Sequence, residues 1–176
     1  MNMVLIGMRG SGKSSVGRML GKKMNKAFIE TDALIAQAGG KPVRTIITEH
    51  GWDFFRKIEC EVVRNLDHKD NSIIATGGGV VLNEKNVTIL KKKGYFIWLK
   101  ARAETLIARI GNDPNRPSLT GKPLDDDIKE TLEARDKLYR EAADVAIDTD
   151  HRLPEDIVEV IMTLIEAPKK KGETTL

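Results

Sequence analysis

Short apolar runs alternate along the chain with longer stretches in which apolar residues recur every three or four positions. The short runs predict five strands, at residues 3–6, 27–30, 72–76, 95–99 and 145–148. Helical patterns fill the gaps, as in residues 155–166, which follow a proline suited to a first helical turn. Because strands and helices alternate, we expect a three-layer α/β/α fold around a five-stranded parallel sheet.

One segment interrupts this alternation. Residues 111–123 contain three prolines and two glycines, so they cannot form regular structure. A loop of this length inside a compact domain usually has a function, and we expect a lid at about residues 111–124. With no internal repeat and no linker, residues 1–167 should form a single domain, followed by a disordered tail at 168–176.

Composition excludes several classes of protein. The chain has 176 residues, of which 40% are hydrophobic and 31% charged, and this fits a soluble globular domain. No apolar run approaches the roughly 18 residues of a membrane span, and the N-terminus lacks a secretory signal, so we expect a cytoplasmic protein without a membrane partner. The net charge is only +3, and the lysine triplets are isolated. We therefore expect no nucleic-acid partner, and we expect a monomer in which the single Cys60 is a buried thiol.

The strongest chemical signal is the phosphate loop, residues 7–14, which reads Gly-Met-Arg-Gly-Ser-Gly-Lys-Ser and matches G-x-x-x-x-G-K-[ST]. It follows a predicted strand and opens a helix, so its backbone N–H groups should converge on a phosphate chain. Lys13 would reach the β- and γ-phosphates, and Ser14 would ligate Mg²⁺. The sequence thus predicts ATP and Mg²⁺ as cofactors, with nucleotide contacts from Gly10, Ser11, Gly12, Lys13, Ser14 and Ser15.

Two carboxylates end the second predicted strand, where ligands of open α/β sheets bind. Glu30 could hold Mg²⁺ through water, and Asp32 could accept or orient a hydroxyl proton. The alternative is that Asp32 only caps a helix at residues 33–38 and Glu30 is merely exposed.

Arg56 and Glu59 stand three residues apart in an aromatic-rich helical segment. Glu59 could hold the Arg56 guanidinium in one orientation, ready to grip a ligand carboxylate through two hydrogen bonds. The alternative is a surface ion pair, with the neighbouring Trp52, Phe54 and Phe55 in the core.

Three consecutive glycines, Gly77, Gly78 and Gly79, follow the third predicted strand. Without side chains to block it, the backbone there could bind an anion or a hydroxyl closely; the alternative is a tight turn, which rarely needs three glycines. The strand lacks a terminal Asp, which argues against the common motor and GTPase classes. Arg116 in the proposed lid could neutralise charge during phosphoryl transfer, whereas ordinary surface charge is the competing interpretation for both Arg116 and Arg135.

Together these segments resemble the shikimate kinase family from residue 5 to about residue 165. The family pattern comprises a P-loop, Asp-x-Asp, aromatic-Arg-x-x-Glu, Thr-Gly-Gly-Gly, an Arg-Pro lid and Arg-x-x-x-Tyr. All six appear in order, except that Glu30 stands where the family usually has Asp. The resemblance implies a P-loop NTPase fold of the nucleoside monophosphate kinase type. It also implies ATP-dependent phosphorylation of the 3-hydroxyl of shikimate, in aromatic amino-acid biosynthesis.

The resemblance also implies roles for individual residues. Asp32 would contact the reacting hydroxyl, Arg56 and Arg135 the carboxylate of shikimate, and the backbone of residues 77–79 its ring hydroxyls. Arg116 would be the catalytic lid arginine beside Lys13. Arg109 and the segment 150–154 fall where the family packs the adenine, with Arg152 and Pro154 as the expected contacts from that segment. A different acceptor, such as gluconate or a nucleoside monophosphate, and a nucleotide-binding relative without catalysis remain the alternatives.

Overall fold

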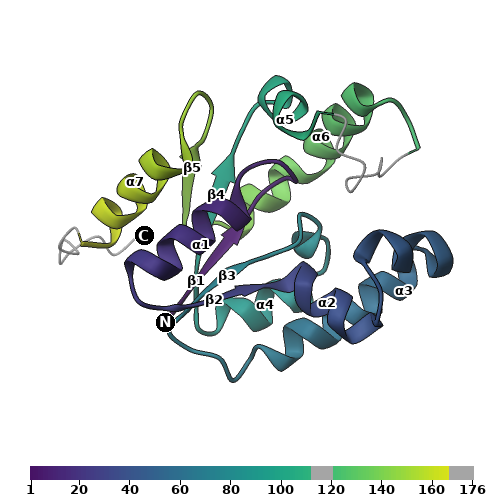
Figure 1. The fold of residues 1–176 in the computed structure, drawn as a ribbon, viewed down its shortest axis with the longest axis horizontal. Helices are drawn as coiled ribbons and strands as arrows, with labels where there is room; N and C mark the ends of the chain where they lie inside the picture. Colours follow the sequence, from purple (N-terminus) through teal and green to yellow (C-terminus); the bar gives the residue numbers. More distant parts are fainter. Residues whose placement is uncertain (112–120, 167–176) are drawn as a thin grey trace.

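A parallel sheet forms the middle layer of the computed structural model, which describes residues 1–111 and 121–166 (Figure 1). Its strands are β1 (Asn2–Ile6), β2 (Ala27–Glu30), β3 (Ser72–Ala75), β4 (Gly94–Lys100) and β5 (Val145–Asp148). Their spatial order is β2-β3-β1-β4-β5, and every neighbouring pair is parallel. The predicted five-stranded parallel sheet is therefore confirmed, and each strand agrees with its predicted range to within one residue at either end.

Helices cover both faces of this sheet, as the sequence predicts (Figure 1). They are α1 (Lys13–Lys23), α2 (Thr31–Gly39), α3 (Val43–Asn65), the 3₁₀ helix η1 (Val80–Leu82), α4 (Glu84–Lys91), α5 (Ala103–Ile110), α6 (Leu124–Ala142) and α7 (Pro154–Glu166). Alternate residues of β1 supply the two cores because successive side chains of a strand point to opposite faces. Val4 and Ile6 pack with α3, α4, α5 and α6, whereas Met3 and Leu5 pack with α1 and α7.

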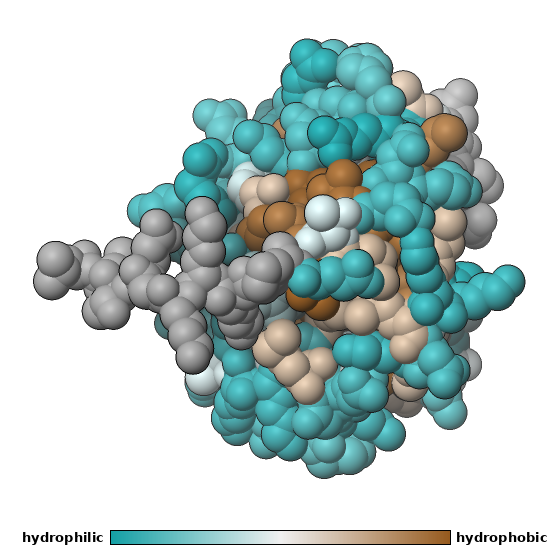
Figure 2. All heavy atoms as spheres, turned by 90° about the vertical axis from the view of Figure 1, so that its left-hand side faces the viewer, coloured by the Kyte–Doolittle hydropathy of each residue, from teal (hydrophilic) through white to brown (hydrophobic). Residues whose placement is uncertain are grey.

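The face on the α7 side of the molecule is shown in Figure 2, where hydrophobic residues gather in the middle and hydrophilic residues surround them. No helix within residues 1–111 and 121–166 is long and apolar enough to cross a membrane.

The irregular segment predicted between α5 and α6 lies mostly beyond the part of the chain that the structure describes. The helix α5 ends at Ile110 and α6 begins at Leu124, while the described residues around them, 111 and 121–123, form neither helix nor strand. The predicted lid residue Arg116 and the predicted tail, 168–176, are outside the described residues. Cys60, which we expected to be buried, is only partly buried, with its Sγ 3.0 Å from Asn83 Nδ2.

Candidate functional site

The site lies at the carboxyl edge of the sheet, where all five parallel strands end. A pocket of about 800 Å³ opens there. Its lining includes every predicted site residue that the structure describes: Gly10, Ser11, Gly12, Lys13, Ser14, Ser15, Glu30, Asp32, Arg56, Gly77, Gly78, Gly79, Arg109, Arg135, Arg152 and Pro154. The phosphate loop follows the central strand β1, so it divides a β2/β3 end of the pocket from a β4/β5 end.

The phosphate loop takes its shape from glycines and from its own lysine. Gly7, Gly10 and Gly12 have φ values of 139°, 81° and 95°, a region that side chains disfavour. The Lys13 Nζ donates hydrogen bonds to the carbonyl oxygens of Gly7 and Met8, both at 2.9 Å. Because α1 begins at Lys13, the N–H groups of its first turn have no partners within the helix and are suited to bind phosphate.

Ser14 and Glu30 meet beside this loop. The Ser14 hydroxyl donates a hydrogen bond to Glu30 Oε1, which joins the first turn of α1 to the end of β2. Mg²⁺ prefers oxygen ligands and is usually held by one or two protein groups together with substrate phosphates and water. The two side-chain oxygens at the phosphate loop fit that pattern.

Asp32 lies inside the first turn of α2, and no side chain caps this helix. The alternative that Asp32 serves as the cap is therefore wrong, and its carboxylate lines the pocket instead. The side chain is exposed to the solvent of the pocket, although protein atoms surround it on most sides. This partial removal from water raises the pKa of Asp32, as does the Glu30 carboxylate, while Lys13 and Arg56 oppose the rise.

The three-glycine turn leaves room for charged side chains. None of its residues has a positive φ, so the turn needs the missing Cβ atoms and not the backbone freedom of glycine. A Cβ on the first glycine would lie 2.7 Å from Asp32 Oδ1, and one on the third would lie 2.1 Å from Arg56 Nη2. A Cβ on the second would lie 3.7 Å from Arg135 Nη1. The structure thus brings Asp32, Arg56 and Arg135 together around this turn.

In the ion pair between Arg56 and Glu59, the Glu59 side chain is buried. Arg56 Nη1 donates to Glu59 Oε2 at 2.7 Å, and the Glu59 side chain is 1% exposed, so the surface-pair alternative is wrong. The guanidinium also lies 5.5 Å and 5.0 Å from the ring centres of Trp52 and Phe55. Of the three aromatic residues, only Phe55 belongs to the core, since Phe54 is 42% exposed and Trp52 lines the pocket. Burial raises the pKa of Glu59, and Arg56 opposes that rise.

Helix α6 places Arg135 by means of Tyr139, one turn further on. The Tyr139 side chain is 0% exposed, and its hydroxyl donates to the Gly78 carbonyl oxygen at 2.5 Å. Its ring stacks on Trp98 with 5.8 Å between the ring centres. Burial raises the pKa of Tyr139 to about 12, so the hydroxyl keeps its proton. The anchor holds α6 against the three-glycine turn, and Arg135 reaches the pocket from the same helix.

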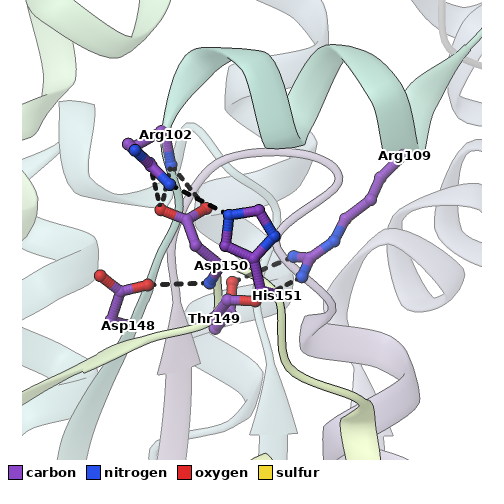
Figure 3. A network of polar contacts seen from close by, with 6 residues as sticks. All are labelled: Arg102, Arg109, Asp148, Thr149, Asp150 and His151. Atoms are coloured by element: carbon purple, nitrogen blue, oxygen red, sulfur yellow. Dashed lines mark hydrogen bonds and ion pairs between the residues drawn. The ribbon is translucent and has the colours of Figure 1, made fainter.

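The β4/β5 end is formed by Arg109 of α5 and by the loop before α7. The Arg109 Nη1 and Nη2 donate to the side-chain and carbonyl oxygens of Thr149, at 3.0 Å and 2.5 Å (Figure 3). Arg152 and Pro154 follow in that loop and at the start of α7, and both line the pocket.

Sequence reasoning missed several pocket residues, and Arg9 is the most consequential. It occupies a variable position of the phosphate loop, and its guanidinium pairs with Asp127 of α6, a side chain that is 0% exposed. The motif gave no reason to single out this position, and the partner is 118 residues away. Arg44 of α3 also lines the pocket without any sequence signal.

The chain is similar to known proteins over nearly its whole length. The family model for shikimate kinase matches residues 9–166. A shikimate kinase from Symbiobacterium thermophilum is 38% identical over 174 residues, which cover 98% of this chain and all of that relative. The shikimate kinase from Acinetobacter baumannii, solved in complex with shikimate, has a TM-score of 0.91 and 32% identity over 97% of this chain and 95% of that one. The shikimate kinase from Aquifex aeolicus has a TM-score of 0.83 and 33% identity, over 98% of this chain and 100% of that one.

Proposed function

This chain belongs to the shikimate kinase family, and on that premise we propose that it transfers the γ-phosphoryl group of ATP to the 3-hydroxyl of shikimate. The observation that carries the proposal is that one pocket is lined by the phosphate loop, by the Asp32 carboxylate and by the Arg56 and Arg135 guanidiniums. The product is shikimate 3-phosphate, an intermediate of aromatic amino-acid biosynthesis.

The β2/β3 end of the pocket is suited to a small ring acid. Arg56 and Arg135 can each donate to the shikimate carboxylate, because both guanidiniums lie beside the three-glycine turn. The backbone of that turn is open to the ring hydroxyls, since no side chain projects from it. Asp32 lies against the first glycine of the turn, where it can receive the hydroxyl that reacts.

Phosphoryl transfer then needs little beyond positioning and charge stabilisation. The oxygen of the 3-hydroxyl attacks the γ-phosphorus, the bond from that phosphorus to the bridging oxygen breaks, and ADP leaves. Asp32 orients the hydroxyl and takes its proton, a task that its raised pKa favours.

The phosphate loop and its neighbours hold the nucleotide. Backbone N–H groups of residues 10–15 and the Lys13 ammonium bind the phosphates, and Ser14 with Glu30 would hold the magnesium. Magnesium, when bound, neutralises charge on the β- and γ-oxygens. Arg116 adds a positive charge from the proposed lid, while Arg109, Arg152 and Pro154 enclose the adenine.

The proposal includes a monomeric, cytoplasmic enzyme whose partner is the small-molecule substrate alone, with no nucleic acid and no membrane. Sedimentation velocity on the purified chain tests the first part. A single species of about 20 kDa is expected from the mass of 19.6 kDa, and a stable dimer would contradict the monomer.

A coupled assay for ADP tests the reaction. With ATP and Mg²⁺, shikimate should give far faster turnover than gluconate or a nucleoside monophosphate, and Lys13→Ala should lose most of that turnover. Calorimetric titration with shikimate tests the β2/β3 end separately, because the acid can bind without nucleotide. Turnover that is absent with shikimate, or fastest with a nucleotide, would overturn the proposal.

A further inference from the structure

The helix α5 lacks a cap of its own, and the loop before α7 supplies one. The side chain of the N-cap residue, Arg102, makes no capping hydrogen bond to α5. Instead, the Asp150 carboxylate accepts a hydrogen bond from the Arg102 backbone N–H, with oxygens at 3.1 Å and 3.3 Å, and another from Arg102 Nε at 2.9 Å (Figure 3). The Asp150 side chain is 7% exposed, although that of Arg102 is 65% exposed. Asp150 is therefore built into the joint between α5 and this loop.

The other end of α5 is fastened to the same loop. Arg109, in the last turn, donates to both oxygens of Thr149, and Thr149 is 0% exposed. The Thr149 backbone N–H donates to the Lys100 carbonyl oxygen at 2.8 Å, which ties the loop to the end of β4. Figure 3 shows Arg102 and Arg109 reaching from α5 toward the loop that carries Thr149, Asp150 and His151.

This joint sets the geometry of the β4/β5 end of the pocket. One wall is the Arg109 side chain. Its two terminal nitrogens donate hydrogen bonds to Thr149 along one edge of the guanidinium group. The planar face of the guanidinium can therefore contact another flat group. The second wall is formed by Arg152 and Pro154, which line the same pocket and stand two and four residues after Asp150 in the chain. The separation of the walls thus depends on how the loop is attached to α5.

The sheet order indicates which group lies between these walls. The phosphates bind at the central strand β1, and the residues proposed for shikimate lie beyond β2 and β3. The transferred phosphoryl group must point toward shikimate, so the rest of the nucleotide must extend to the other side, over β4 and β5. The flat group at that end is then the base.

We propose that Asp150 is a positioning residue for the nucleotide base, because it holds the Arg109 wall and the Arg152–Pro154 wall at a fixed separation. It acts through Arg102 and the loop backbone and does not itself line the pocket. This inference rests on the proposed function for the identity of the nucleotide. Burial alone would raise the pKa of Asp150, but the hydrogen bonds from Thr105 and Arg102 together outweigh it and hold this pKa below its usual value, so the carboxylate is charged when the joint forms.

The test compares ATP with inorganic tripolyphosphate, which has the phosphates but no base. For Asp150→Ala we expect the dissociation constant of ATP to rise about tenfold, as for the loss of about one charge-assisted hydrogen bond. The dissociation constant of tripolyphosphate, and that of shikimate, should stay unchanged in calorimetry. Turnover at saturating ATP should also stay close to the wild-type value, so the effect appears in the KM for ATP. Discrimination between ATP and GTP should weaken in parallel.

Three further variants separate positioning from folding. Asp150→Asn keeps an oxygen acceptor and should rescue part of the ATP affinity, whereas Arg102→Ala keeps the backbone contact and should have a milder effect than Asp150→Ala. Asp136→Asn breaks an exposed ion pair with Arg140 on α6, away from the pocket, and should change none of these constants. If Asp150→Ala does not fold, Asp150→Asn carries the same comparison. Equal losses for ATP and tripolyphosphate, or an unchanged ATP affinity, would overturn the proposal, whatever the outcome of the shikimate assay.

Discussion

Asp32 combines a catalytic position with an unfavourable environment for its charge. Its carboxylate lies against the three-glycine turn and near Glu30, and incomplete hydration raises its pKa. Functional sites often hold carboxylates in this way, because a raised pKa improves a carboxylate as a proton acceptor.

Asp32→Asn tests the catalytic part of this argument. The amide keeps the size of the side chain and can still bind the hydroxyl, but it cannot take the proton. We expect kcat to fall by about 10²–10⁴, the usual range for loss of a general base, with a smaller change in the KM for shikimate. Steady-state kinetics measures both constants, and a variant with wild-type kcat would show that Asp32 takes no proton.

The same variant tests the raised pKa. Asp32 holds its proton to a higher pH in the folded chain than in the unfolded chain, so its contribution to stability is full below the ordinary pKa of 3.8. That contribution is lost as pH rises through the raised value. The free energy of unfolding of Asp32→Asn, relative to the wild type, should therefore increase as pH rises from 3.8 through the raised pKa. Above that pH the difference should stay constant. Urea unfolding of both proteins from about pH 4 to about pH 8 measures the difference, and a difference that shrinks with pH would contradict the shift.

Arg56 has two effects that can be separated. Arg56→Ala should weaken shikimate binding by about 1.5–3 kcal/mol, and it should also destabilise the fold, because Glu59 is then buried without its partner. In the double variant with Glu59→Gln, stability should recover in large part while shikimate binding stays weak. Urea unfolding and calorimetry give the two quantities independently. Recovery of binding in the double variant would show that Arg56 does not contact the ligand.

The three-glycine turn is the element that gathers the site. Each of its missing Cβ atoms makes room for a different charged group or for the backbone of the phosphate loop. The need for this room explains why three glycines occur in a row. Helix α6 complements the turn, since Tyr139 fastens the helix to it and Arg135 follows from the same helix. The position of this helix therefore depends on a hydrogen bond to the backbone of the turn.

Two glycine-to-alanine variants separate a functional clash from a structural one. In Gly79→Ala the new Cβ meets the flexible end of Arg56, which can move away, so we expect an increase of about tenfold in the KM for shikimate and a smaller loss of stability than in Arg56→Ala. In Gly94→Ala the Cβ would lie 2.4 Å from the Leu90 carbonyl oxygen and 2.7 Å from Val4 Cγ2. Packed core atoms cannot yield, so this variant should lose about 1–3 kcal/mol of stability and keep its KM. Thermal unfolding and kinetics check the pair, and the reverse pattern would contradict it.

Across the whole molecule, the sequence predicted local features better than distant contacts. Strand positions followed from short buried runs, and the phosphate loop from a motif whose every fixed position has a chemical reason. The strand order did not follow, because crossovers are decided by packing between distant segments. The burial of Glu59 was equally hidden, since most pairs at that spacing lie on a surface. Arg9 and Asp127 are too far apart in sequence for any local pattern to pair them.

Lys13 has hydrogen-bond partners within the phosphate loop itself. Its ammonium already has two backbone carbonyl oxygens as partners, and these belong to the loop that will receive the phosphates. A triphosphate that binds there would replace these carbonyl oxygens with phosphate oxygens around the same ammonium group. The positive charge proposed to contact the β- and γ-phosphates is thus compensated by carbonyl dipoles of the same loop.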